Sequence, residues 1–167
     1  ILNNWIGVFM NRGRHCVIDG NTIIGGTYGV RLYSSTQNNV SRNTVSVNVY
    51  YGYGIYLDSC SDNEIYENSV TNNRLGIKLL SSGNNHIYKN NFVDNVGQVS
   101  FGSSSVNTWD NGAEGNYWSD YNGTDQNGDG IGDTAYNIGD DVDLYPLMEP
   151  WSPFKVFYVV WKTAVYN

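Results

Sequence analysis

The sequence contains little charge. Only 15% of its 167 residues are charged, and 9 Lys and Arg against 16 Asp and Glu give a formal net charge of -7. A chain of this sign lacks the basic surface that neutralises a phosphate backbone. We therefore expect no nucleic-acid partner.

Cysteines and long apolar runs are also scarce. Two cysteines, Cys16 and Cys60, are too few for a disulfide framework or a zinc site. The longest apolar stretch, residues 154–165, is interrupted by two lysines and is well short of the roughly 20 residues of a membrane-spanning helix. We therefore expect no membrane span.

What the sequence does contain is a repeat. Four glycines, Gly7, Gly29, Gly54 and Gly76, are separated by 22, 25 and 22 residues. When the chain is aligned on them, apolar residues recur 1, 3, 11 and 16 positions after each glycine, and asparagine recurs 9 and 14 positions after it. The asparagine columns are Asn38, Asn63 and Asn85, with Cys16 at this place in the first repeat, and Asn21, Asn43, Asn68 and Asn90.

This repeat predicts an all-β fold, a right-handed parallel β-helix. Each unit of about 22 residues holds three short β-like runs separated by Gly, Asn, Asp or Ser, so we expect a three-sided solenoid with coils stacked about 4.8 Å apart. A leucine-rich repeat needs a helical return segment, which no run fits. Asparagine suits the corners, because it tolerates left-handed backbone and its amide can bond to its copies in neighbouring coils. The hand follows from the usual right-handed crossover.

The repeat also divides the chain. Residues 1–106 are expected to form the coils, 107–150 a loop-rich C-terminal cap, and 151–167 an apolar, β-prone tail. Residues 1–6 read as the end of a preceding coil, which predicts an N-terminally truncated solenoid. Its open strand edges make end-to-end or tail-mediated self-association a further expectation. Cys16 and Cys60 fall at different places of coils two turns apart, so both thiols are expected to be free.

The pattern G-[IV]-x-[LM] followed by N-x-[IV]-x-x-N-x-[IV] resembles the NosD-type periplasmic copper-binding β-helix family. It also resembles the wider class of carbohydrate-binding and sugar-hydrolase repeats with the pectate-lyase fold. NTWD at 107–110, GNYWSDY at 115–121 and DLYPLM at 143–148 look like the closing segment of such proteins on archaeal and bacterial surfaces. The resemblance implies an extracellular, cell-surface or periplasmic location and sugar binding.

The strongest signal for a metal is an Asp/Gly loop at residues 125–133. It reads D-x-N-x-D-G-x-G-D and begins like a calcium-binding loop with oxygen ligands at alternate positions, although the usual twelfth-position glutamate is replaced by Tyr136. We predict that it binds calcium as the cofactor; the alternative is a turn-rich surface loop without an ion. The predicted ligands are Asp125, Asn127, Asp129, Ile131 and Asp133.

Outward-facing aromatic and basic residues are the candidates for sugar binding. Arg31, Tyr56 and Lys78 share a column two positions after the glycine, and Tyr66 and Tyr88 share one at twelve. These tyrosines, and the run Tyr50, Tyr51 and Tyr53 in the longer second repeat, could serve as platforms for sugar rings. Stacked tyrosines also stabilise neighbouring strands without any ligand. A polysaccharide or cell-surface glycan is accordingly the expected partner.

Catalysis and copper binding have weaker support. A lyase or hydrolase needs a base or a carboxylate pair at the site, and Asp58, Asp62 and Asp94 fall in three different columns, so we name no catalytic residue. Copper would need clustered nitrogen or sulfur ligands. His15 and His86 lie three coils apart, about 14 Å by strand spacing, so they cannot share an ion. We therefore predict a non-catalytic, calcium-stabilised module for surface structure or carbohydrate binding. The alternatives are a polysaccharide lyase and a copper-handling periplasmic protein.

Overall fold

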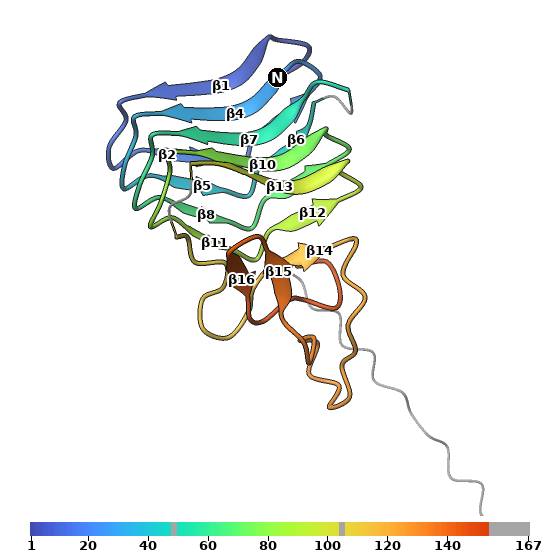
Figure 1. Cartoon of the computed structure of the whole chain (residues 1–167). Helices are drawn as coiled ribbons and strands as arrows, with labels where there is room; N and C mark the ends of the chain where they lie inside the picture. The colour runs from blue at the N-terminus through green and yellow to red at the C-terminus, as the bar shows by residue number, and fades with distance from the viewer. Residues whose placement is uncertain (48–49, 104–105, 154–167) are drawn as a thin grey trace, which may run out of the picture.

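A computed structural model describes residues 1–47, 50–103 and 106–153. Sixteen strands and no helix are found in these residues, so none of them forms a helix that could span a membrane. The chain winds into stacked coils, with a loop-rich segment below them (Figure 1). The predicted right-handed parallel β-helix is confirmed. Of the predicted tail, residues 154–167 lie outside the described part.

Three parallel sheets form the three sides of the solenoid. The long-strand sheet contains β1 (Ile6–Asn11), β4 (Tyr28–Tyr33), β7 (Tyr53–Asp58), β10 (Leu75–Leu80) and β13 (Gly97–Gly102). The second sheet contains β2 (Val17–Asp19), β5 (Asn39–Ser41), β8 (Glu64–Tyr66) and β11 (His86–Tyr88). The third contains β3 (Thr22–Ile24), β6 (Thr44–Ser46), β9 (Ser69–Thr71), β12 (Asn91–Val93) and β14 (Tyr117–Trp118).

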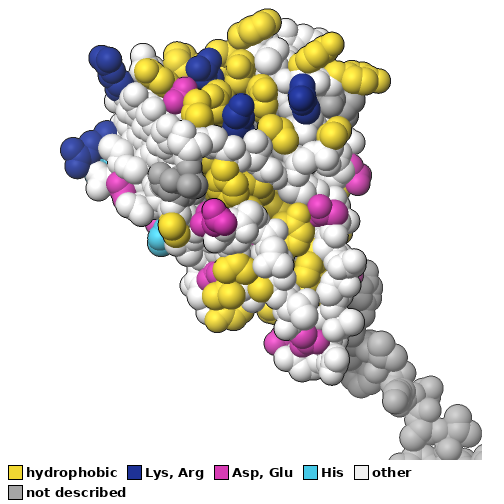
Figure 2. All heavy atoms as spheres, in the orientation of Figure 1, with side chains coloured by type: hydrophobic (Ala, Val, Ile, Leu, Met, Phe, Trp, Pro, Cys, Tyr) yellow, Lys and Arg dark blue, Asp and Glu magenta, His cyan; other side chains and the backbone are white. Residues whose placement is uncertain are grey.

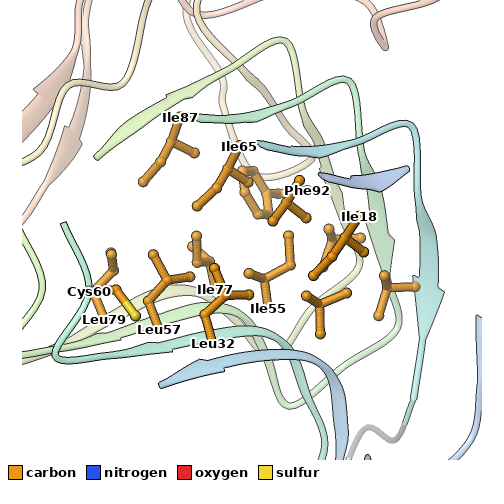
Figure 3. Close-up of a cluster of buried hydrophobic side chains, with 14 of the residues drawn as sticks. Ile18, Leu32, Ile55, Leu57, Cys60, Ile65, Ile77, Leu79, Ile87 and Phe92 are labelled. Atoms are coloured by element: carbon orange, nitrogen blue, oxygen red, sulfur yellow. The ribbon is translucent and has the colours of Figure 1, made fainter. Parts of the chain in front are cut away.

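The register of the sheets reproduces the predicted columns. Val30 pairs with Val8 and Ile55 in the long-strand sheet, and the other two sheets pair Ile18 with Val40 and Ile23 with Val45. Like residues therefore stack on like, and their side chains fill the interior (Figure 3). This burial of branched and aromatic side chains is the main stabilising term of the fold.

The glycine column has a steric cause. A Cβ on Gly54 would lie 2.6 Å from the carbonyl oxygen of Gly76 and would also meet Val70 of the facing sheet, and Gly29 has the same surroundings one coil earlier. A side chain at this place would have to displace backbone. The spacing that revealed the repeat thus marks where each long strand approaches the opposite wall.

Asparagines form the predicted ladders. Asn68 Nδ2 donates to Asn90 Oδ1 at 2.9 Å, and Asn43 Nδ2 donates to Asn68 Oδ1 at 2.9 Å. Backbone N–H groups of the same residues donate to the same oxygens. The two ladders run from Asn21 through Asn43, Asn68 and Asn90 to Asn116, and from Asn38 through Asn63 and Asn85 to Asn107.

The reason given for asparagine at the corners was partly wrong. Positive φ angles fall on the residue before the ladder asparagine, such as Arg42 (52°) before Asn43 and Glu67 (59°) before Asn68. Asparagine is required for its amide, which satisfies backbone groups of adjacent coils, and the preceding residue makes the left-handed turn.

A third ladder was not predicted. Asn73 Nδ2 donates to Asn95 Oδ1 at 2.9 Å, and the amide of Val47 donates to Asn73 Oδ1 at 2.7 Å. Only two coils carry asparagine here in the described residues, since Val47 takes the place one coil earlier. A column of two members is too short to be recognised in a sequence.

The lower end of the solenoid is closed by two tryptophans and an antiparallel hairpin. Trp109 and Trp118 are 0% and 1% exposed, and Trp118 stacks on Phe92 of the last complete coil. The hairpin pairs β15 (Tyr136–Ile138) with β16 (Asp141–Asp143). Parallel pairing continues beyond residue 106, because β14 pairs with β12.

Strand β16 ends both long ladders with carboxylates. Asp143 Oδ2 accepts the amide N–H of Asn116 at 2.7 Å and the indole N–H of Trp118 at 2.9 Å. Asp141 Oδ2 accepts the corresponding groups of Asn107 at 3.2 Å and Trp109 at 3.0 Å. A carboxylate only accepts hydrogen bonds, so it satisfies the last donors and offers none to a further coil.

Both cysteines are free thiols, as expected. Cys16 is exposed, and its backbone N–H donates to Asn38 Oδ1 at the start of a ladder. Cys60 is buried among the apolar residues of the core, and burial raises the pKa of its thiol. Cys60 is therefore a core residue rather than a reactive group.

Candidate functional site

The outer face of the long-strand sheet carries a column of alternating rings and cations. Arg31 pairs with Phe9 on one side and with Tyr56 on the other, and Lys78 follows Tyr56. The sequence placed these residues in one outward column, and the register confirms this. Successive strands thus bring Arg31, Tyr56 and Lys78 together, although they are far apart in the sequence.

Aromatic rings surround the guanidinium group of Arg31. Its carbon Cζ lies 5.0 Å from the ring centroid of Tyr28, 5.4 Å from that of Tyr56 and 5.7 Å from that of Phe9. Each distance is within the reach of a cation–π interaction. The Arg31 Nε atom is buried and has no hydrogen-bond partner in the described residues.

Lys78 is held in the same way one strand beyond Tyr56. Its Nζ atom lies 5.1 Å from the ring centroid of Tyr53 and 5.5 Å from that of Tyr56. The Tyr28 ring stacks on those of Tyr53 at 5.4 Å and Tyr56 at 5.6 Å. We call this group the long-face cluster; its members are Phe9, Tyr28, Arg31, Tyr53, Tyr56 and Lys78.

Tyr28 was missed by sequence reasoning, and Tyr53 was proposed only within the run Tyr50, Tyr51 and Tyr53, apart from the column of Arg31, Tyr56 and Lys78. Tyr28 and Tyr53 pair with each other in the sheet and stand directly before Gly29 and Gly54. Alternation along the strand assigns these places to the interior. The glycine that follows faces the opposite wall, which leaves the tyrosine ring at the strand start on the outer surface. A tyrosine before the glycine in two successive coils was the available signal.

The two cations of the cluster have no carboxylate partner among the described residues. The ion pairs there join Arg42 to Asp19 and Lys89 to Glu114, each at 2.7 Å. Burial, and to a smaller extent the charge of Asp58, raises the pKa of the Tyr56 hydroxyl, so this ring is neutral at physiological pH. In Figure 2, basic side chains lie among hydrophobic ones over this sheet.

The tyrosine pair predicted on the same grounds lies on a different side. Tyr66 and Tyr88 belong to β8 and β11 of the second sheet, and their rings stack at 5.4 Å with an interplanar angle of 7°. Burial raises the pKa of Tyr88 to about 12. The five predicted sugar-binding residues therefore divide between two faces, with Arg31, Tyr56 and Lys78 on one and Tyr66 and Tyr88 on the other.

The Asp/Gly loop is folded around its own aspartates. Asp125 accepts backbone N–H groups of Gly128 at 2.7 Å and Gly130 at 2.8 Å, and Asp129 accepts that of Ile131 at 2.8 Å. Asn127 Nδ2 donates to Asp129 Oδ2 at 2.9 Å.

At the far end of this loop, Asp133 Oδ2 accepts the amide of Gln126 at 2.9 Å. Within the described ranges, no three His, Cys, Asp or Glu side chains are arranged to hold a metal ion. Calcium binding by the five predicted ligands stays a prediction.

Soft and imidazole ligands are likewise dispersed. His15 lies beside β2 and His86 begins β11, at opposite ends of the second sheet. Cys16 is exposed next to His15, whereas Cys60 is buried in the core. Copper prefers clustered nitrogen and sulfur ligands. The described residues therefore do not fit a copper centre built from these groups.

A hollow lies between β13 and β15. Its volume is about 280 Å³, and its walls are formed by residues 98–101 and 136–139. The titratable side chain among them is Tyr136, which donates to Asp120. Burial first, and then Asp120, raises the pKa of Tyr136. The hollow thus offers neither a base nor a carboxylate pair for catalysis.

Comparisons with known proteins identify the family of the chain. A family model described as "Periplasmic copper-binding protein (NosD)" matches residues 1–123. Two curated relatives are named "Probable ABC transporter binding protein NosD". The one from Pseudomonas aeruginosa is 32% identical over 148 residues, and the one from Stutzerimonas stutzeri is 34% identical over 149. Each alignment covers 84% of this chain but 31% of the relative, so the chain spans about a third of their length. The family's periplasmic description confirms the expected extracytoplasmic location.

Proposed function

The chain belongs to the NosD family of periplasmic proteins, and we propose that it is a non-catalytic β-helix module whose long-strand face binds a glycan. The observation that carries this proposal is the long-face cluster. There, three mutually close tyrosine rings and two cations without carboxylate partners lie on adjacent strands. Sugar binding combines ring stacking with polar contacts, and the cluster offers both.

The shape of this face favours an extended ligand. The cluster lies on the outer side of five parallel strands rather than in the hollow beside β13. Small-molecule sites usually enclose most of their ligand, whereas a row of rings across several coils can contact successive units of a chain. A polysaccharide suits such a row better than a single sugar.

The arrangement of the side chains supports a binding role over a lyase. In a polysaccharide lyase, Arg31 or Lys78 would have to act as the base. Both are held against aromatic rings, and neither has a carboxylate beside it in the described part of the chain. A hydrolase requires a pair of facing carboxylates, and no acidic pair lies within the cluster.

The names of the relatives also support binding. Both are described as transporter binding proteins, a role that requires recognition and no chemistry at the module itself. Copper handling is the alternative, favoured by the family's description. We do not assign copper to these coils, because His15 and His86 lie at opposite ends of the second sheet.

A glycan-binding panel tests the proposal. The chain should bind at least one polysaccharide in affinity electrophoresis without releasing reducing or unsaturated ends. Replacement of Tyr53 and Lys78 by alanine should weaken that binding at least about tenfold, since each stacking or charged contact contributes roughly 1 kcal/mol or more.

The matched control is the pair Tyr66→Ala and Tyr88→Ala on the second sheet, which should retain binding. Turnover of any bound polysaccharide, or a loss confined to the control pair, would contradict the proposal. Far-ultraviolet circular dichroism should show that all variants keep the fold.

A further inference from the structure

We propose, building on the glycan-binding function, that the long-face cluster selects a polyanionic glycan, with Arg31 and Lys78 each binding a carboxylate on a different unit of the chain. The first support is the contrast among the basic residues. Arg42 and Lys89 each meet a carboxylate at 2.7 Å. The other basic side chains of the described residues have no ion pair, and among them Arg31 and Lys78 are the two that lie against aromatic rings.

The rings change what these charges can bind. Three aromatic neighbours replace water around the Arg31 guanidinium, and its Nε atom is covered without a hydrogen-bond partner. A charge that has lost part of its hydration interacts more strongly with a counter-ion than one in bulk water. The rings also fix the side chain, so less conformational entropy is lost when an anion arrives.

The spacing of the two cations indicates a polymer rather than a single small anion. Arg31 and Lys78 are in register on β4 and β10, with Tyr56 of β7 between them. Two strand spacings separate their backbones by about 9.6 Å, and both head groups lie beside the Tyr56 ring. Carboxylates on separate units of one chain can pair with each cation, while a sugar ring lies over the half-buried rings of Tyr28 and Tyr53. Tyr56, which is 8% exposed, supports both cations from below.

Acid selectivity is tested with a polyuronate and its neutral derivative. Alginate and its propylene glycol ester share the same sugar backbone, but the ester groups remove the charge. Calorimetric titration of the full chain should show binding of alginate and at least about tenfold weaker binding of the ester. Higher salt should weaken the alginate interaction selectively, because screening acts on charge pairs.

Variants separate the two cations from overall charge. Arg31→Gln with Lys78→Gln should reduce alginate affinity at least about tenfold and leave the weak ester binding unchanged. Arg12→Gln with Arg14→Gln removes the same charge from an exposed corner of the first coil and should change the affinity less than about twofold.

Each other outcome has a defined meaning. Equal binding of alginate and ester overturns the acid selectivity but leaves glycan binding intact. Equal losses in both double variants also overturn it, because overall charge would then explain the binding. Absence of binding to either polymer and to the whole neutral panel overturns this inference together with the proposed function.

Discussion

At the scale of single residues, asparagine is the side chain on which the coils depend. Asn68 is 0% exposed; its amide donates to Val40 O at 2.9 Å and to Asn90 Oδ1 at 2.9 Å, while its oxygen accepts two N–H groups of Asn43. The asparagine amide both donates and accepts hydrogen bonds, and so satisfies buried backbone groups of two coils at once. An aspartate carboxylate could only accept, and a leucine side chain could neither donate nor accept.

Asn68→Ala should therefore lower the free energy of unfolding by about 2 to 4 kcal/mol, because it leaves several buried polar groups without partners. Asn21→Ala is the control: Asn21 begins the same ladder, is half-buried, and donates to Asn43 without accepting in return. Asn21→Ala should lower the free energy of unfolding by less than about 1 kcal/mol, since water can replace the hydrogen bonds of this side chain. Urea denaturation measures both, and equal losses would contradict the role assigned to the ladder.

Asp143 is the residue whose ionisation should govern stability near neutral pH. Burial raises its pKa to about 6 from 3.8, although the amide of Asn116, the indole of Trp118 and the amide of Tyr145 lower it. A carboxyl whose pKa is raised on folding stabilises the fold while protonated, and this contribution is lost as the pH rises through the folded-state pKa.

Between pH 7 and pH 4.5 this group should add about 2 kcal/mol to the free energy of unfolding, from roughly 1.4 kcal/mol for each pH unit over which the two states differ. Asp143→Asn should remove that component. The measurement is the difference between wild type and variant in urea denaturation at the two pH values. Parallel pH dependence of the two proteins would show that Asp143 does not titrate there.

At the scale of elements, most of the solenoid could be predicted from the sequence. The strands repeat in register, so the same inward position is apolar in three successive coils, as Val30, Ile55 and Ile77. The closing hairpin could not be predicted in this way. Asp141 lies 34 residues after Asn107 in the sequence, and Asp143 lies 27 after Asn116. A contact made once leaves no periodic signal.

The candidate site was predictable only in part, for the same reason. Arg31, Tyr56 and Lys78 stand in one alternating column and were found together. Tyr28 was missed, and Tyr53 was not joined to this column, because the glycine after each faces the opposite wall and reverses the expected alternation. Tyr66 and Tyr88 share the chemistry but belong to another side, which agrees with their separate column twelve positions after the glycine.

The Asp/Gly loop is the element whose ligand is still to be tested. Calcium binding predicts heat on titration of the metal-stripped chain, and saturation about 100-fold above the dissociation constant predicts about 2.7 kcal/mol of added stability. Asp129→Asn should weaken this binding, because calcium prefers charged oxygen ligands.

Asp94→Asn serves as the control for that titration. Asp94 is exposed and follows β12, outside the Asp/Gly loop. The variant loses the same single negative charge as Asp129→Asn, but its calcium affinity should equal that of the wild type. No calcium heat in the wild-type chain would identify residues 125–133 as a loop folded by its own aspartates, with Asp125 holding the amides of Gly128 and Gly130.

At the scale of the whole molecule, stacking converts a short repeat into a broad surface. Five strands of the long-strand sheet place equivalent residues side by side along the solenoid axis (Figure 1). The core and the asparagine ladders occupy the interior, so outward positions are free to vary without loss of the fold. The long-face cluster occupies such outward positions on β1, β4, β7 and β10. Its extent across four strands suits recognition of a long polymer.

The most direct test of a binding role for this face is to locate the contact. Backbone and tyrosine chemical shifts of the isotope-labelled chain should be followed while alginate is added. Binding at the long-face cluster predicts changes concentrated on β4, β7 and β10 and on the rings of Tyr28, Tyr53 and Tyr56. Changes confined to β8 and β11 around Tyr66 and Tyr88, or no changes with alginate or any polysaccharide of the panel, would contradict it.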